Sequence, residues 1–163
     1  MSESEETAST IGKKGVEMSG IVVGVDGSEG ASHALEWAAA EARLRGKPLT
    51  VLLAWQWPTG VYAGAGWVGI TQEMVGDLER IAKERLDAAC ATVAPALDGV
   101  EVERVVVEGG PAQALMQVAA DADLLVVGTR GHGGFVGLLL GSVSQQCAHH
   151  SQCPIVIVPP RET

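Results

Sequence analysis

The chain has 163 residues, enough for one domain with a sizeable core, and 47% of them are hydrophobic whereas only 4% are aromatic. This composition, dominated by Val, Ala and Leu, is typical of a soluble α/β protein, and no uninterrupted apolar run reaches the length of a membrane span. The net charge of −9, without a basic stripe, argues against nucleic-acid binding, because an acidic body repels phosphate backbones.

The N-terminal residues differ in character from the rest. Residues 1–19 are polar, rich in Ser and Glu and without hydrophobic period, which predicts a disordered tail before one domain at residues 20–160. The tail has no apolar segment of the signal-peptide type, so we expect a cytoplasmic protein. The three cysteines, Cys90, Cys147 and Cys153, are then expected to be reduced thiols that are buried or nearly so.

Strand and helix patterns alternate through the rest of the chain. Strands are predicted within 20–25, 49–55, 99–110, 123–128 and 153–160, and helices after Ser28, through Met74, Leu78, Ile81, Arg85 and Ala89, from Pro111, and from Gly141–Ser142. Strands of continuous apolar character are buried on both faces. The pattern therefore predicts an α/β fold, a doubly wound five-stranded parallel sheet of the Rossmann-like type with helices on both faces.

The stretch "GTRGHGGFVGLLLGS", residues 128–142, places a glycine-rich loop directly after the fourth strand. In doubly wound sheets, ligands lie outside the carboxyl ends of the strands where the strand order reverses, and a central first strand puts this loop there. Glycine lets N–H groups converge on an anion, and a helix that begins at Gly141–Ser142 favours negative charge. Arg130 adds a cation, and Ser142 and Ser144 add hydroxyl donors. These features predict a polyphosphate site; the alternative is a mobile surface loop.

The loop resembles a known family motif. Gly128-x-x-Gly131, nine residues, and then Gly141-Ser142 is similar to the G-2x-G-9x-G-(S/T) pattern of the universal stress proteins. The stretches "VVGVDGS", "EGGPAQAL" and "GSVSQQCAHHSQCPIVIV" resemble other parts of the same family, over residues 20–159. The resemblance implies an ATP-binding α/β domain, usually a homodimer, that is induced or used under stress. Because the phosphate site has no evident catalytic base, we expect a nucleotide-dependent regulatory module in the stress response.

The resemblance also implies roles for particular residues. Asp26 would meet the ribose or the adenine, Gly24 and Val25 would line the base pocket, Ala54 would contribute backbone to the adenine, and Gly109 would border the sugar. The phosphates, with Mg²⁺, would be held by Gly128, Arg130, Gly131, Gly141, Ser142 and Ser144. Because the loop pattern is intact, the ATP-binding subclass is favoured.

Two other functions use the same sequence features. A slow Mg²⁺-dependent ATPase would use the same site, with His132 or Asp26 assisting a metal-bound water. A nucleotide-independent interaction protein would carry the loop as a vestige. A Walker A loop is absent, because no Lys precedes Ser142, and an FMN carrier would be expected to have its phosphate loop after the first strand.

Several further motifs allow more than one interpretation. "GAGWVG" at residues 64–69 matches the dinucleotide fingerprint as a string but lacks the strand directly before it. The aromatic residues nearby either cover a bound base, contact a partner or pack on the domain's own surface, and they are Trp55, Trp57, Tyr62 and Trp67. Four side chains are possible zinc ligands without a clear reason to converge, namely Cys147, His149, His150 and Cys153. The apolar strand at 154–158 predicts an exposed sheet edge and an isologous dimer through it.

Overall fold

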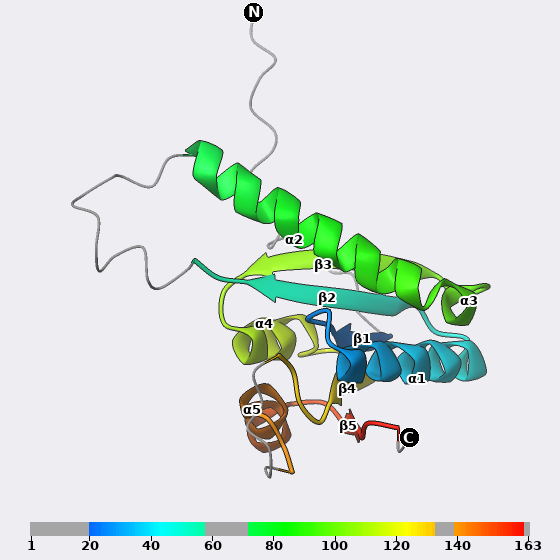
Figure 1. Ribbon diagram of the computed structural model, residues 1–163. Coiled ribbons are helices and arrows are strands. Elements are labelled where there is room, and N and C mark those ends of the chain that lie inside the picture. The colour runs from blue at the N-terminus through cyan, green and yellow to red at the C-terminus, as the bar shows by residue number, and fades with distance from the viewer. Residues whose placement is uncertain (1–19, 58–71, 133–138, 162–163) are drawn as a thin grey trace, which may run out of the picture.

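The computed structural model describes residues 20–57, 72–132 and 139–161 (Figure 1). Five parallel strands form one sheet in the order β3-β2-β1-β4-β5. Their bounds are β1 Ile21–Gly24, β2 Leu49–Trp55, β3 Val102–Glu108, β4 Leu124–Gly128 and β5 Ile155–Val158. The predicted doubly wound α/β fold is confirmed. The predicted tail at 1–19, the "GAGWVG" string, Tyr62 and Trp67 lie outside the described residues.

Helices cover both faces of the sheet, with α2 lying over β2 and β3 in Figure 1. Their bounds are α1 Glu29–Arg45, α2 Gln72–Thr92, α3 Ala94–Leu97, α4 Pro111–Val118 and α5 Ser142–His150. Three predicted starts are confirmed, because Ser28 caps α1, Pro111 begins α4 and Gly141 is the N-cap of α5. The four-residue helix α3 was not predicted from the sequence.

Two hydrophobic clusters, one on each face, account for the continuous apolar strands. Val23 and Val51 pack with α1 and α2, while Val22, Leu52 and Leu125 pack with α4 and α5. Alternate side chains of one strand therefore enter opposite clusters, which is the reason that a parallel strand lacks polar alternation. None of the helices that the structure describes is both long enough and apolar enough to cross a bilayer.

The predicted second helix is present as α2, but the residues that mark it in the sequence are not all buried. Ala82, Leu86, Ala89 and Cys90 are the buried residues of α2, whereas Met74, Ile81 and Arg85 are exposed. Of the residues that mark the helix, Ala89 alone is buried, so the spacing that predicts the helix does not identify the face that packs on the sheet.

The centre of the sheet defines where a ligand can enter. β1 lies at the centre of the sheet, between β2 and β4. From β1 the chain adds β2 and β3 on one side, and it then crosses over to add β4 and β5 on the other side. The carboxyl ends of β1 and β4 flank the point at which the strand order reverses, which is the ligand position in doubly wound sheets. The first strand is thus central, which is the condition under which the sequence places the glycine-rich loop at this point.

Candidate functional site

A cavity of about 610 Å³ lies at the carboxyl edge of the sheet. Its volume falls within the range of roughly 300–1,000 Å³ that is typical of small-molecule sites. Ten residues predicted for the site line it, namely Gly24, Val25, Asp26, Ala54, Gly128, Arg130, Gly131, Gly141, Ser142 and Ser144. Gly109 follows β3 and is not among the lining residues; its N–H donates to the Trp55 carbonyl at 2.9 Å.

Asp26 joins the two loops that meet at this cavity. One carboxylate oxygen accepts the Ser28 N–H and the other accepts the His132 N–H, both at 2.9 Å. Burial alone would raise the pKa of Asp26, but the hydrogen bonds from Ser28 and His132 outweigh it, so the pKa lies below its usual 3.8. Asp26 is therefore held as a carboxylate, and it ties the β1 loop to the glycine loop 106 residues later.

Two glycines of the motif have packing reasons that the sequence does not reveal. A Cβ at Gly128 would come within 3.0 Å of the Gly30 carbonyl oxygen, because the first turn of α1 approaches the end of β4 closely. A Cβ at Gly131 would overlap the Asp26 carboxylate. Both glycines thus permit the loops to close around the cavity, whatever they contribute to a ligand.

The start of α5 forms a second wall of the cavity. No side chain caps this helix end, and Gly141, Ser142, Val143 and Ser144 all line the cavity. The first N–H groups of a helix have no acceptor within the helix, so this end presents free donors and the positive end of a dipole. The arrangement suits an anion.

The two serines of this turn are placed differently. Ser144 is 2% exposed, and its hydroxyl lies 2.8 Å from the Thr129 carbonyl and 3.0 Å from the Gly141 carbonyl, either of which it can donate to. Its hydroxyl therefore holds the loop against α5. The exposed Ser142 has no hydrogen bond from its side chain within the described part of the chain, so its hydroxyl is free for a ligand.

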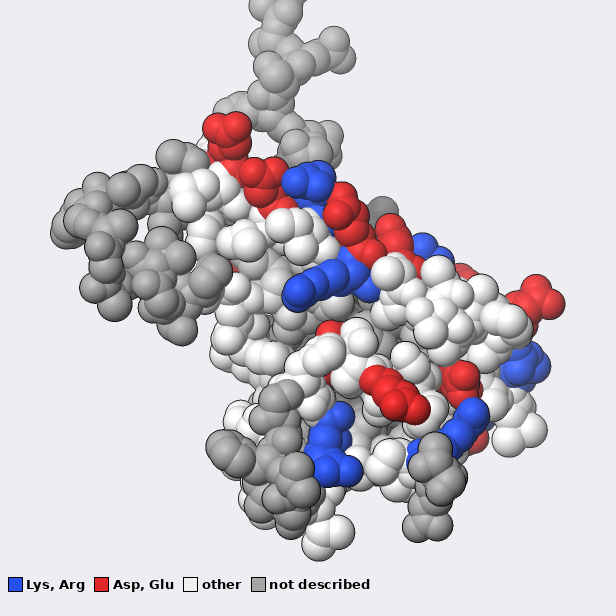
Figure 2. Space-filling view, in the orientation of Figure 1, with Lys and Arg blue, Asp and Glu red and all other residues white. Residues whose placement is uncertain are grey.

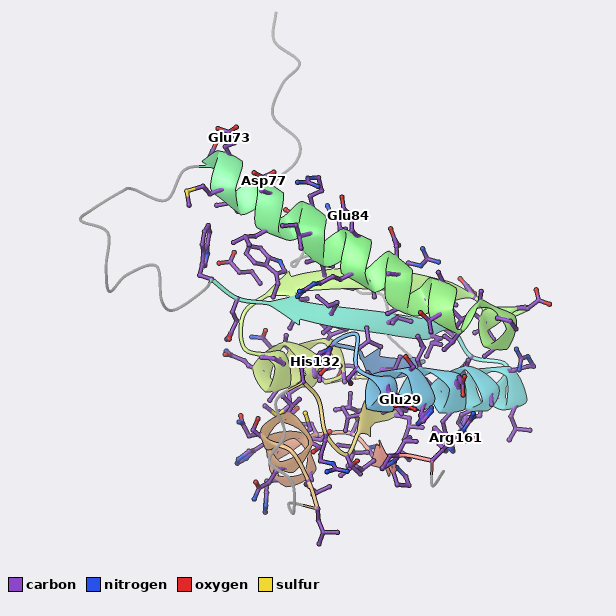
Figure 3. The ribbon with its side chains drawn as sticks, viewed as in Figure 1. Glu29, Glu73, Asp77, Glu84, His132 and Arg161 are labelled. Carbon is purple, nitrogen blue, oxygen red and sulfur yellow. The ribbon has the colours of Figure 1, made fainter. Side chains whose placement is uncertain are left out.

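Three groups from two segments of the chain carry positive charge or a titratable ring at the cavity. Arg130 and His132 belong to the loop after β4, and Figure 3 places His132 at the carboxyl edge of the sheet between α4 and the start of α1. Arg85 reaches the cavity from α2. The sequence reasoning did not assign Arg85 to the site; its signal was a charged residue placed within a stripe of otherwise apolar residues in the predicted helix.

The other motifs lie apart from the cavity lining. Trp55 and Trp57 pack edge to face with ring centroids 6.1 Å apart, and Trp57 Nε1 donates to Glu108 Oε1 at 3.0 Å. Packing on the domain itself therefore accounts for these two rings. Among the described residues no three His, Cys, Asp or Glu side chains converge on a metal position, and Cys147 is buried whereas His149 and His150 are exposed.

The cysteines are placed as the sequence suggested. All three are free thiols; Cys90 and Cys147 are buried, and Cys153 is partly buried. Burial raises the pKa of the Cys90 and Cys147 thiols, which keeps them protonated and unreactive near neutral pH.

Comparison with known protein families gives one match that covers most of the chain. The model described as "Universal stress protein family" matches residues 18–159. Universal stress protein Rv2623 of Mycobacterium tuberculosis is 36% identical over 143 residues, which are 84% of this chain and 44% of that protein. The chain thus spans less than half the length of the mycobacterial relatives it matches. A Thermus aquaticus universal stress protein is 36% identical over 85% of this chain and 96% of its own length.

Solved structures show the same architecture. A universal stress protein in complex with cAMP has a TM-score of 0.66 and 26% identity over 88% of this chain and 98% of its own. The Archaeoglobus fulgidus universal stress protein in complex with dAMP has a TM-score of 0.59 and 28% identity over 86% and 97%. The structure of MJ0577 has a TM-score of 0.71 over 91% and 100%, and its 22% identity supports the fold alone.

Proposed function

The chain belongs to the universal stress protein family, and we propose that it binds an adenine nucleotide, ATP with Mg²⁺, as a nucleotide-dependent regulatory module in the stress response. The observation that carries the proposal is the uncapped start of α5, which faces a cavity shared with Arg130. Two structurally similar family members are complexes with cAMP and dAMP, which supports an adenine nucleotide as the ligand class.

The cavity has two chemically different ends. At one end the free N–H groups of α5, the Ser142 hydroxyl and Arg130 suit phosphate oxygens. At the other end the carboxyl ends of β1 and β2 present Val25, Leu53 and Ala54, which suit an apolar base. We assign the phosphates to the first end and the adenine to the second, with Asp26 between them.

A magnesium ion fits this arrangement only together with the nucleotide. Mg²⁺ usually binds through substrate phosphates and one or two protein oxygens, retaining several waters. Asp26 is the carboxylate among the described lining residues, and the free Ser142 hydroxyl is a further oxygen at the phosphate end. These two residues would hold the ion, which would neutralise phosphate charge.

Regulation by binding is favoured over rapid hydrolysis because the site offers a poor base. The hydrogen bonds from Ser28 and His132 keep the pKa of Asp26 low, and a carboxylate of low pKa accepts a proton from water weakly. A slow Mg²⁺-dependent ATPase remains the second candidate function, supported by the position of His132 beside Asp26 at the same cavity.

The test is to purify the protein gently without added nucleotide, release any ligand by heat and identify it by chromatography. Recovered ATP supports the proposal, and recovered ADP favours slow hydrolysis. A protein that is empty and also fails to bind added Mg·ATP overturns the proposal and leaves the nucleotide-independent interaction protein as the interpretation.

A matched variant strengthens this test. Gly141→Val covers the start of α5, and a Cβ at position 141 meets its nearest neighbours at 3.4 Å, an ordinary contact. We expect this variant to keep its circular dichroism spectrum and thermal midpoint but to lose bound nucleotide. Equal nucleotide content in the variant and the parent protein would contradict the assignment of the phosphates to α5.

Two further parts of the proposal concern assembly and location. β5 lies at one edge of the sheet, and we propose that two copies pair through residues 154–158 as an isologous dimer. We also propose a cytoplasmic location, which is where cellular ATP is available to the site.

A further inference from the structure

Two arginines of the described chain have no partner. Every other described Arg or Lys side chain bonds to a carboxylate or a backbone carbonyl, namely Arg43, Arg45, Lys47, Arg80, Lys83, Arg104 and Arg161. Within the same described ranges, Arg85 and Arg130 form no ion pair or hydrogen bond through their side chains, and both line the cavity.

The contrast is clearest along α2 itself. Arg80 pairs with Asp77 and Glu84, and Figure 2 shows acidic and basic side chains following one another along the outer surface of this helix. Figure 3 shows Glu73, Asp77 and Glu84 pointing away from the sheet. Arg85 lines the cavity instead, so it stands apart from the carboxylates that would otherwise neutralise it.

The two free arginines approach the cavity from different sides. Arg130 follows β4, whereas Arg85 belongs to α2, which packs on β2 and β3. β2 and β4 flank β1, and neighbouring strands are about 4.8 Å apart. The strand that α2 covers, β2, is therefore about 10 Å across the sheet from β4, which Arg130 follows. Arg85 therefore enters at the end of the cavity that is lined by Leu53 and Ala54.

Within the described ranges, no aromatic side chain lines this end of the cavity. His132 is the one aromatic side chain among the described lining residues, and it belongs to the glycine loop after β4. Trp55 and Trp57 pack on each other and are not part of the lining. Among the described lining residues, a purine base bound against the ends of β1 and β2 would meet aliphatic groups of Val25, Leu53 and Ala54, and Arg85 is the planar side chain available to its free face.

We propose that Arg85 is a base-contacting residue whose guanidinium stacks on the purine ring, at the end of the cavity opposite to Arg130. This inference rests on the proposed nucleotide-binding function and adds to it a contact from α2. A guanidinium is planar and delocalised, and it stacks on bases as well as on aromatic side chains. The ammonium of a lysine has the same charge but no such plane, so the proposal distinguishes Arg85→Lys from the parent protein.

The test uses two probes that represent the two ends of ATP. Binding of adenosine, of inorganic tripolyphosphate and of Mg·ATP is measured by calorimetry at one ionic strength for Arg85→Gln, Arg85→Lys and Arg130→Gln. Arg80→Gln is the matched control, because it removes a guanidinium from the same helix outside the cavity.

The two arginines should separate the two probes. We expect Arg85→Gln to weaken adenosine and ATP binding about 5- to 30-fold while tripolyphosphate binding stays within twofold of the parent. Arg85→Lys should lose nearly as much affinity for adenosine as Arg85→Gln. Arg130→Gln should weaken the binding of tripolyphosphate and ATP and leave adenosine binding unchanged. Arg80→Gln should change the affinity for none of the three ligands.

Each contrary result has its own meaning. A loss of tripolyphosphate affinity in Arg85→Gln would make Arg85 a phosphate ligand and overturn the stacking contact. Full adenosine affinity in Arg85→Gln or Arg85→Lys would overturn it as well. Failure of the proposed function is distinguishable, because the parent protein would then bind neither adenosine nor ATP, whereas a failed inference leaves parent binding intact.

Discussion

At the scale of single residues, the glycine loop is fixed by a carboxylate. Asp26 accepts the N–H groups of Ser28 and His132, and the absence of a side chain at Gly131 leaves room for its second oxygen. Hydrogen bonds to a charged acceptor are stronger than those between neutral groups. The position of Gly131 and His132 at the cavity therefore depends on the charge of Asp26 and on the absence of a methyl group at Gly131.

Gly131→Ala should destabilise the protein through this contact. The added Cβ displaces the Asp26 carboxylate and breaks its hydrogen bond from the His132 N–H, so we expect the free energy of unfolding to fall by about 1–3 kcal/mol. Gly76→Ala is the control, because this exposed position of α2 has nothing within 4 Å of the added Cβ. It should raise the stability by about 0.5–1 kcal/mol, as alanine is the better helix former. Urea unfolding of the parent protein and of both variants measures these changes. A Gly131→Ala variant as stable as the parent protein would show that the loop tolerates the methyl group.

Asp26→Asn should alter how stability depends on pH. The pKa of Asp26 in the folded protein lies below its usual 3.8, so its contribution is present above the pKa of the unfolded chain and is lost as the pH falls through the folded pKa. We therefore expect the parent protein without nucleotide to exceed Asp26→Asn in stability at pH 5–7, and the gap to close below pH 3.8. Urea unfolding across this range measures it, and a gap that stays constant with pH would contradict the assigned role of the charge.

At the scale of elements, the first turn of α5 divides its tasks between two serines. The buried Ser144 hydroxyl holds the Thr129–Gly141 region, whereas the exposed Ser142 hydroxyl is free. Ser144→Ala should lower the free energy of unfolding by about 1 kcal/mol, since the Thr129 carbonyl keeps its bond from the Gly141 N–H at 2.7 Å. Ser142→Ala should leave stability within about 0.5 kcal/mol and weaken Mg·ATP binding. Thermal unfolding and calorimetry separate the two effects, and an exchange of the two outcomes would refute this division.

The elements themselves were largely predictable because most strands are short, mainly apolar runs that stop at a glycine, a proline or a polar residue. Leu49–Trp55 was predicted with the bounds it has, and α4 and α5 begin where Pro111 and Gly141–Ser142 indicated. The helix α3 was missed because its four residues carry no hydrophobic period. Apolar periodicity and capping residues therefore suffice to predict an element whose own residues carry these signals.

The site was predictable only as far as its local motif extends. The spacing of the glycines indicated the loop and the start of α5, and both line the cavity. The approach of Gly30 to Gly128 joins segments far apart in the chain, so no local pattern contains it. The charge of Arg85 within an apolar stripe is a local signal, but it does not say which distant segments Arg85 meets at the cavity. The rotation of α2 about its axis decides whether Arg85 reaches the cavity, and packing against the sheet sets that rotation.

At the scale of the whole molecule, β5 is an edge strand, and no described strand pairs with its outer edge. The carbonyl of Pro154 accepts a hydrogen bond from the Leu125 N–H of β4, and that of Val158 accepts one from the Thr129 N–H just after β4. Backbone groups alternate in direction along a strand, so those of Ile155 and Ile157 point away from β4. This edge carries no charged side chain in Ile155–Val158, and an unblocked edge favours pairing with another chain.

The dimer proposed through this edge is tested by a pair of substitutions at one position. Ile157→Pro removes an outward N–H and keeps the hydrogen bonds to β4, whereas Ile157→Ala removes the same side-chain packing and keeps the N–H. In sedimentation equilibrium at micromolar concentration, we expect the parent protein and Ile157→Ala to be dimers and Ile157→Pro to be a monomer. Because both variants lose the packing of the Ile157 side chain, the contrast between them reports on the backbone edge. A monomeric parent protein would contradict the dimer, and a dimeric Ile157→Pro would place the interface on a different surface.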